Sequence, residues 1–307
     1  MSFVYIQNFM GLSNGLNTIN GAVVVPANAT HGYCHCDSSA STTIDRFAFA
    51  TDGNALDVGD TNTGQYERGA SSDITGGYSY VFSGKSGSTR INSIERHQNA
   101  SSANGADVGD LTTDVRAPSS SESSTHGYRA GGWNGSGVNV IDKFAFGSSS
   151  AGTDVGDLTV GRTKCGGCTS STHGYTIGGF PASNVIDKYQ YSSDANATDV
   201  GDALSSAYLG IGTEDDDAFG YLQGNNSDTT QVQRFSFSVD GDAVDVGNLN
   251  RTGIYGFGAT SLTYGYNSQG AAGASDIQKH TFASSVVMTD VGELSVSRLQ
   301  GSTGSQG

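Results

Sequence analysis

Short apolar segments alternate with polar, glycine-rich turns along the chain, and the same order of segments recurs six times. Each copy has a Gly-Tyr segment such as 173–175, an Ile-Asp-Lys-Phe type segment such as 186–189 and an Asp-Val-Gly-Asp type segment such as 199–202. A small Ser/Gly-rich segment such as 69–72 lies between one copy and the next. Short apolar runs bounded by turn residues predict β-strands, and no stretch has sustained helical spacing. The pattern therefore predicts four strands in each repeat.

The acidic segment defines the period of the repeat. Its copies begin at Asp57, Asp107, Asp154, Asp199, Asp245 and Asp290, in steps of 50, 47, 45, 46 and 45 residues. A unit of this length cannot bury its own apolar face, so several units must stack around a shared core. Four short antiparallel strands repeated six times are typical of a six-bladed β-propeller. We predict an all-β chain with an N-terminal arm over residues 1–20 and one propeller of four-stranded antiparallel blades over residues 21–307.

The end of the chain predicts how the ring closes. The chain stops at Gly307, just short of the place where a seventh Gly-Tyr segment would come. The segment 298–307 is then an inner strand without a repeat of its own, and we expect this C-terminal strand to complete the first blade. In an alternative arrangement, residues 21–25 supply that strand.

A basic residue stands at one place in the third strand of every copy, 11 residues before the first Asp of the acidic motif. An antiparallel hairpin with its turn midway would place the two side by side, which predicts a repeated ion pair, partly buried between blades. Five further arginines follow the motif at looser spacing. The first set is Arg46, Arg96, Lys143, Lys188, Arg234 and Lys279, and the second is Arg68, Arg116, Arg162, Arg251 and Arg298. The acidic motif is on this interpretation part of the scaffold.

The acidic composition of the chain disfavours some classes of binding partner. The chain has 30 acidic and 15 basic residues, a formal net charge of −15, which disfavours binding to nucleic-acid phosphates or anionic membranes. No apolar run approaches the roughly 18 residues that cross a bilayer, so we expect no membrane insertion. The N-terminal residues lack a basic region followed by a long apolar one, so we expect no signal peptide and synthesis in a cytoplasm.

Candidate chemistry is sparse. Cys34 and Cys36 fall on a second strand, whereas Cys165 and Cys168 fall on an inner strand three blades away, so free thiols are a better interpretation than one shared zinc site. A local disulfide between Cys165 and Cys168 is an alternative. Of the six histidines only His35 departs from the repeat, and no nucleophile elbow, zinc-protease motif or phosphate loop occurs. We therefore predict no enzymatic activity and no metal or cofactor.

Two turns resemble oxygen-rich calcium loops, because Asp52-x-Asn54 and Asp194-x-Asn196 precede the acidic motif. Two of the six copies lack those ligands, so ordinary Asp and Asn turns explain the sequence at least as well. The acidic run 214–217 is a further candidate for a cation near the channel, although such a run is commonly solvated.

Loop length is the better guide to binding. The distance from the Gly-Tyr segment to the third strand is 13 residues in four blades, 18 in blade two and 15 in blade three. Insertions in propellers collect on one face, commonly the binding face. These two loops carry Lys85, Arg90 and Trp133, which we predict to be binding residues, with Trp133 as a platform for a sugar ring or a partner side chain. Neutral loop drift, with Trp133 packed on its own blade, is the alternative.

The segments 173–179, 186–189 and 199–202 resemble a kelch repeat, with an apolar run ending in Gly-Gly and a following strand that contains an aromatic residue. The repeat departs from kelch where a Trp is usual, because the acidic motif stands there. It is also similar to Gly/Ser-rich repeat proteins of marine bacteriophages and algal viruses. That resemblance implies a tail fibre or other virion component that docks to other virion structural proteins or to a host-surface glycan. A kelch-like copper oxidase acting on carbohydrate and a cellular protein-interaction adaptor are the alternatives.

Overall fold

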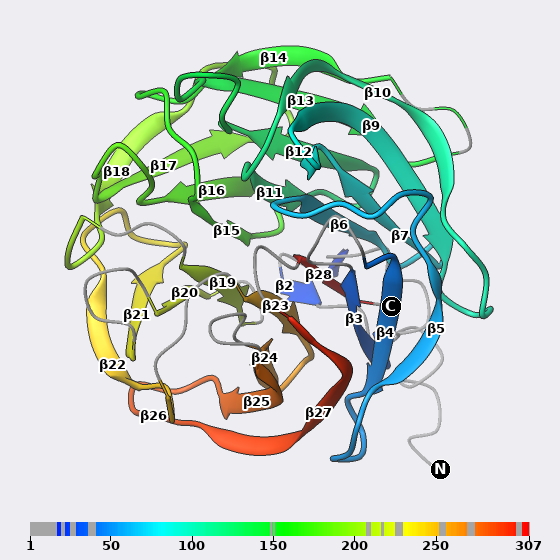
Figure 1. Ribbon diagram of the computed structural model, residues 1–307. Helices are drawn as coiled ribbons and strands as arrows, with labels where there is room; N and C mark the ends of the chain where they lie inside the picture. Colours follow the sequence, from blue (N-terminus) through cyan, green and yellow to red (C-terminus); the bar gives the residue numbers. More distant parts are fainter. Residues whose placement is uncertain are drawn as a thin grey trace, which may run out of the picture.

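Six small antiparallel sheets stand in a ring around a central axis (Figure 1). The computed structural model describes residues 17–19, 22–24, 29–35, 41–147, 149, 151–206, 210–215, 218–224, 230–251, 256–268, 274–298 and 303–306. The described part is all-β, which confirms the predicted six-bladed propeller. Within it, no helix is long and apolar enough to span a bilayer.

In each blade the strands follow one another from the axis outward (Figure 1). Blade 1 consists of β28 (Thr303–Gln306), β3 (His31–His35), β4 (Thr43–Ala48) and β5 (Leu56–Asp60). Blade 2 consists of β6 (Gly69–Asp73), β7 (Tyr78–Phe82), β9 (Thr89–Gln98) and β10 (Ala106–Val115), with β8 (Lys85–Ser86) paired to β9. Blade 3 consists of β11 (Ser119–Glu122), β12 (His126–Ala130), β13 (Val140–Ala145) and β14 (Thr153–Asp157).

The second half of the ring repeats this order. Blade 4 consists of β15 (Gly166–Thr169), β16 (His173–Ile177), β17 (Val185–Gln190) and β18 (Thr198–Asp202). Blade 5 consists of β19 (Ile211–Glu214), β20 (Phe219–Gln223), β21 (Gln231–Ser236) and β22 (Val244–Asn248), with β26 (Val286–Val287) added in parallel outside β22. Blade 6 consists of β23 (Phe257–Thr260), β24 (Tyr264–Ser268), β25 (Ala274–Thr281) and β27 (Thr289–Arg298).

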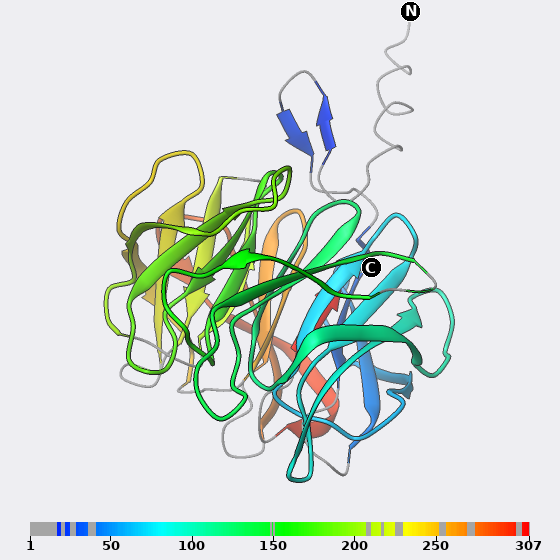
Figure 2. The same cartoon turned by 90° about the horizontal axis from the view of Figure 1, so that it is seen from above.

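The C-terminal strand closes the ring. Strand β28 pairs antiparallel with β3, with Ser305 opposite Tyr33, so the first blade takes its inner strand from the end of the chain. Residues 22–24, within the alternative closing segment, instead form β2 (Ala22–Val24), which pairs with β1 (Asn17–Ile19). This hairpin stands clear of the ring (Figure 2).

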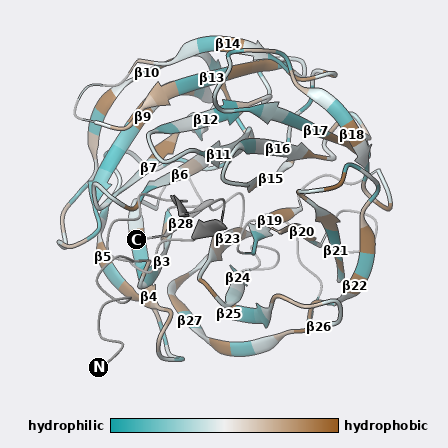
Figure 3. Ribbon diagram, turned by 180° about the vertical axis from the view of Figure 1, so that it is seen from behind, coloured by the Kyte–Doolittle hydropathy of each residue, from teal (hydrophilic) through white to brown (hydrophobic). Residues whose placement is uncertain are grey.

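The core lies between neighbouring blades. A tyrosine on the second strand packs against two aromatic rings of the next blade, as Tyr175 does against Phe235 and Phe237. The Gly before that tyrosine is required because a Cβ at Gly174 would lie 2.4 Å from the ring of Tyr189. The outer strands alternate hydrophobic and hydrophilic residues (Figure 3), as strands with one buried and one solvated face do.

The acidic motif joins each blade to the next. The motif glycines have φ between +147° and +157°, and each donates its N–H to the first motif Asp. A Cβ on Gly201 would lie 2.3 Å from the carbonyl oxygen of Gly241, in the turn of the following blade. The carbonyl of Asp202 accepts the N–H of Ala243 in that same turn at 2.8 Å. The motif is therefore a bulge on which the neighbouring turn is docked.

The predicted ion pair between the third-strand cation and the motif Asp is wrong. The bulge shifts the register, so Lys188 opposes Thr198, and Asp199 opposes Asp187. The cation reaches the next blade instead: Lys188 Nζ lies 2.7 Å from Asp240 Oδ1. Lys143 and Lys279 make the same contact, at 2.5 Å, with Asp194 and Asp52. The interaction lies between blades as expected, but its partner is the turn aspartate.

The second strand of blade 2 begins two residues later than the sequence suggests. The Gly-Tyr pattern of the sequence selects Gly76-Gly77-Tyr78 for blade 2. In the structure Tyr80 opposes the third-strand cation Arg96, as Tyr128 opposes Lys143 in blade 3. The pair Gly76-Gly77 belongs to the preceding turn, where Gly77 has φ +72°. The insertion between the second and third strands of blade 2 is therefore two residues shorter than the sequence spacing indicates.

Candidate functional site

The inserted loops lie at the end of each blade where the connections between blades also run. In a four-stranded antiparallel blade, the loop between strands two and three shares this end with the connection from strand four to the next inner strand. In blades 2 to 4 the segments on the connection side are residues 62–68, 112–118 and 159–165, the second of which includes the end of β10. The segments on the loop side are residues 83–91, 131–139 and 178–184, the first of which includes β8 and the start of β9. We call these six segments the blade 2–4 arc.

Backbone hydrogen bonds join the segments of the arc into one structure. Each loop pairs with its connection at equivalent places: Lys85 with Tyr66, Trp133 with Arg116, and Phe180 with Thr163. Further bonds run from two loops to the segment that leaves the same blade, from the N–H of Gly84 to the carbonyl of Val115 at 2.8 Å and from the N–H of Gly132 to the carbonyl of Arg162 at 2.9 Å. Successive connections are joined by the N–H of Ala117 with the carbonyl of Glu67 and by the N–H of Lys164 with the carbonyl of Ala117. Lys85, Trp133 and Phe180 thus occupy corresponding positions on three consecutive blades, held by a continuous backbone network.

Two aromatic side chains meet on this arc. The rings of Trp133 and Phe180 have centroids 6.3 Å apart and planes inclined by 55°. Trp133 is half-buried, and Phe180 is 42 % exposed. Trp133 therefore packs on a residue of the next blade and still offers part of its indole to solvent, which neither sequence interpretation of this residue described.

Lys85 and Arg90 face each other in the small hairpin that blade 2 inserts. They are cross-strand partners in the pairing of β8 with β9. The Lys85 ammonium lies 5.6 Å from the centroid of the Tyr66 ring, and Arg90 Nε lies 3.8 Å from Asp114 Oδ2. The three predicted binding residues Lys85, Arg90 and Trp133 therefore all lie on the arc, with Lys85 and Trp133 at equivalent positions of adjacent blades.

Four further cations contribute to the arc. Arg116 Nη1 lies 2.5 Å from Glu67 Oε2, and its side chain is 27 % exposed. Lys164 follows Thr163, and its N–H donates to the carbonyl of Ala117. Arg68 and Arg162 are instead completely buried and paired with Glu95 and Asp187 on the third strands. The arc thus contains both buried scaffold pairs and cations at the surface.

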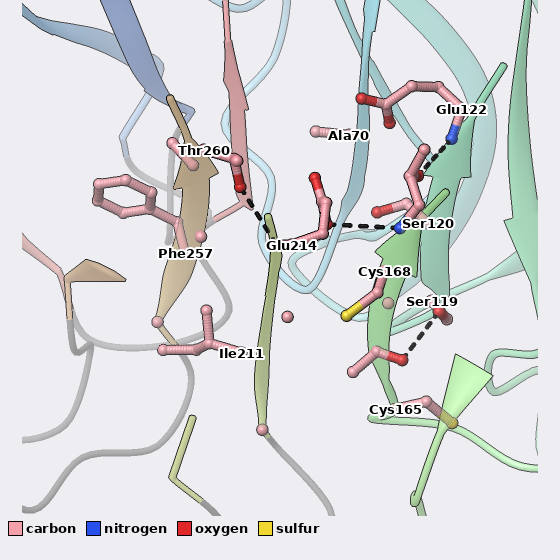
Figure 4. Close-up of a pocket in the computed structure, with 18 of the residues that line it drawn as sticks. Ala70, Ser119, Ser120, Glu122, Cys165, Cys168, Ile211, Glu214, Phe257 and Thr260 are labelled. Carbon is pink, nitrogen blue, oxygen red and sulfur yellow. Dashed lines mark hydrogen bonds between the residues drawn. The ribbon is translucent and has the colours of Figure 1, made fainter. Parts of the chain in front are cut away.

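A second candidate site is the axial channel, a hollow of about 150 Å³ lined by inner strands (Figure 4). Glu122 on β11 and Glu214 on β19 lie at equivalent ends of their strands, with Thr169 of β15 between them. The N–H of Glu122 donates to Thr169 Oγ1, and the N–H of Thr169 donates to Glu214 Oε2 at 3.4 Å. The inner strands hold these side chains in a fixed order around the axis.

Burial changes the acidity of both channel glutamates. Desolvation raises the pKa of Glu214 to about 7, against weaker opposing hydrogen bonds from Thr169 and Thr260. Desolvation, reinforced by the charge of Glu214, raises the pKa of Glu122 well above its usual value. Both carboxyl groups therefore release their protons at a higher pH than an exposed glutamate does, and Glu214 titrates close to neutrality.

The other candidates from the sequence have scaffold contacts. Asp52 and Asp194 bind the lysines of the preceding blade, and Asn54 and Asn196 accept backbone N–H groups from its acidic motif. Cys34 lies on β3, whereas Cys165 and Cys168 belong to blade 4, and all three are free thiols. Cys36, Asp216 and Asp217 lie outside the described residues. His35 is buried against His97, with ring centroids 4.7 Å apart.

Sequence reasoning missed Phe180, Tyr66 and Glu122 as lining residues and treated Glu214 only as part of an acidic run. Aligning the inner strands would have found Glu122, because it precedes a second strand by four residues, as Thr169 and Thr260 do. Glu214 precedes its second strand by five residues, so this spacing does not align it. Aligning the Gly-Gly pairs that follow the second strands would have shown that Phe180 and Trp133 occupy the same position of the repeat, because each of the two aromatic residues comes directly after such a pair.

No family model matches the chain, and no curated protein is significantly similar to it. Within the described ranges, no group of three or more His, Cys, Asp or Glu side chains is placed to hold a metal ion.

Proposed function

We propose that this chain is a non-enzymatic component of a virus particle that binds a host-surface glycan through the blade 2–4 arc. The observation that carries the binding proposal is the aromatic pair of Trp133 and Phe180, fixed by backbone pairing on adjacent blades and open to solvent. A half-exposed aromatic ring on a rigid support is suited to stacking on a sugar ring, because little conformational freedom is lost on binding. The virion context is the expectation drawn from the Gly/Ser-rich character of the repeat, and other virion structural proteins are the further partners in that context.

Glycan binding is tested with the purified chain on an array of host-surface oligosaccharides. Trp133→Ala is expected to lower affinity by roughly tenfold or more, as removal of a central aromatic anchor commonly does. Leu262→Ala is the matched control, because Leu262 is 47 % exposed and belongs to the turn between strands one and two of blade 6, at the opposite face. Equal binding by the wild type and Trp133→Ala, with both proteins folded, would contradict the proposal.

The virion context needs a separate measurement. Peptides of this chain are expected in purified particles analysed by mass spectrometry, at a constant ratio to the capsid protein across the density peak. Presence only in the infected-cell lysate would rule out a structural role and leave the binding proposal to stand alone.

A further inference from the structure

The blade 2–4 arc has the opposite charge balance from the rest of the chain. Its six segments contain six of the 15 basic residues, namely Arg68, Lys85, Arg90, Arg116, Arg162 and Lys164. They contain only two of the 30 acidic residues, Glu67 and Asp114. The arc therefore has a formal charge of 6 − 2 = +4, and the remainder has −15 − 4 = −19. Such a reversal on one surface indicates attraction for an anion.

The exposed part of this charge comes from the loops. Arg68 and Arg162 are buried and neutralised by strand carboxylates, so Lys85, Arg90, Arg116 and Lys164 supply the surface charge. Of the two arc acids, Glu67 is buried beneath Arg116, and only Asp114 is well exposed. Cations at the surface thus outnumber carboxylates there.

The arrangement of Lys85 and Arg90 is informative in itself. Two like charges on directly opposed positions of a hairpin repel each other, which disfavours the pairing. One nearby carboxylate, Asp114, offsets part of that repulsion at 3.8 Å from Arg90. An anionic ligand bound between Lys85 and Arg90 would offset the remaining repulsion. Binding of such a ligand would therefore explain why the inserted hairpin has a cation on both strands.

We propose that the arc binds an anionic saccharide, one that bears a carboxylate or a sulfate group; this inference rests on the glycan-binding function proposed above. A sugar ring stacks on Trp133 and Phe180, and the anionic group binds Lys85 and Arg90 by charge-assisted hydrogen bonds. The loops favour a saccharide over an acidic polypeptide, because 83–91 and 131–139 consist mainly of Gly, Ser, Thr and Asn. Such loops offer hydroxyl and amide groups but little apolar area for a protein partner.

The experiment compares three trisaccharide- or disaccharide-sized probes by calorimetry at 50 mM and 300 mM NaCl: 3′-sialyllactose, 3′-sulfolactose and lactose. At low salt the wild type is expected to bind at least one anionic probe about tenfold more tightly than lactose, with the preference falling as salt rises. The double variant Lys85→Ser/Arg90→Ser is expected to lose that preference. Lys188→Ser is the matched control, because it removes a cation from the inter-blade contact with Asp240, outside the arc, and should keep the preference.

The outcomes separate the two proposals. Trp133-dependent binding of lactose with equal or higher affinity would overturn the anionic class and leave glycan binding intact. An anionic preference that survives in Lys85→Ser/Arg90→Ser would place the anion elsewhere and also overturn this inference. Binding of polyglutamate with no binding of any saccharide would overturn both proposals in favour of an acidic polypeptide, and no binding of any probe by the folded protein would contradict both.

Discussion

Glu214 shows how strongly position changes the chemistry of a single residue. Its sequence neighbours are acidic, and a surface run is the simplest expectation for them. The strand β19 instead directs it to the axis, where it accepts the N–H of Thr169 while its own N–H donates to Thr260 Oγ1. Desolvation in this channel is the main reason that the pKa of Glu214 rises to about 7.

Substitution of Glu214 tests this effect through the pH dependence of stability. Because the folded state holds the proton more tightly than the unfolded chain, ionisation costs stability as the pH rises from about 4.5 to about 7. Glu214→Gln removes that cost, so its free energy of unfolding relative to the wild type should rise across this window by up to about 3 kcal/mol. Urea unfolding of both proteins at pH 4, 5.5 and 8 measures this difference in the free energy of unfolding.

Asp154→Asn is the control for this measurement, because Asp154 is exposed on the outer strand and its amide can still accept the N–H of Gly156. It should show no comparable gain between pH 4.5 and 7. A difference between Glu214→Gln and the wild type that stays constant with pH would show that the channel does not perturb this carboxyl.

At the scale of elements, the acidic motif recurs because of the backbone bulge that it forms more than because of its negative charge. All six first aspartates are exposed and bond to the motif glycine two residues on. The glycine conformation then allows the next turn to approach closely. Asp and Gly recur at these positions because together they form a bulge that fits the crowded interface between blades.

Gly201→Ala tests the bulge. A Cβ there would meet the Gly241 carbonyl at 2.3 Å in a backbone conformation unfavourable for L residues. We expect a loss of about 2–4 kcal/mol in the free energy of unfolding, from strain and overpacking together. Gly241→Ala is the matched control on the other side of the same contact, since nothing lies within 4 Å of its Cβ position. Equal stability of the two variants in urea unfolding would contradict the docking role.

Spacing predicted the hairpins but not their register. The constant 11-residue step from the third-strand cation to the first motif Asp indicated a hairpin of fixed length. It could not reveal that a bulge would turn Asp199 away from Lys188, because a one-residue shift in pairing leaves the sequence distance unchanged. The contact from Lys188 to Asp240 joins residues 52 positions apart, and only the packing of neighbouring blades shows it.

At the scale of the whole molecule, the ring is closed by contacts like those within it. Tyr266 of blade 6 stacks on Phe49 of blade 1 at 4.8 Å, and Lys279 pairs with Asp52. The closing strand β28 then pairs with β3 inside blade 1. The first and last blades are thus joined both by side chains and by a shared sheet.

Removal of residues 299–307 tests closure. Without β28, blade 1 lacks its inner strand and β3 has an exposed edge, so we expect a loss of several kcal/mol and a Tm lower by roughly 10 °C. Removal of residues 1–24 is the control, because β1 and β2 pair with each other and with no blade strand. Scanning calorimetry compares the two truncations, and equal Tm values would contradict closure by the C-terminal strand.

The sequence predicted those residues of the candidate site that lie in inserted loops, but not those that act through contacts between blades. Departures from the repeat identified Lys85, Arg90 and Trp133, because an inserted loop is visible in one sequence. Phe180 stands in a loop of regular length, and its importance depends on Trp133 of the neighbouring blade. Residues that act through contact between blades are not distinguished by spacing within one repeat.

Hydrogen–deuterium exchange with and without saturating anionic saccharide, either 3′-sialyllactose or 3′-sulfolactose, tests most directly whether the blade 2–4 arc is the binding site. We expect slower exchange of backbone amides in 83–91, 131–139 and 178–184, with the inner strands β11, β15 and β19 unchanged. Slower exchange confined to those inner strands, or to turns at the opposite face, would contradict this expectation.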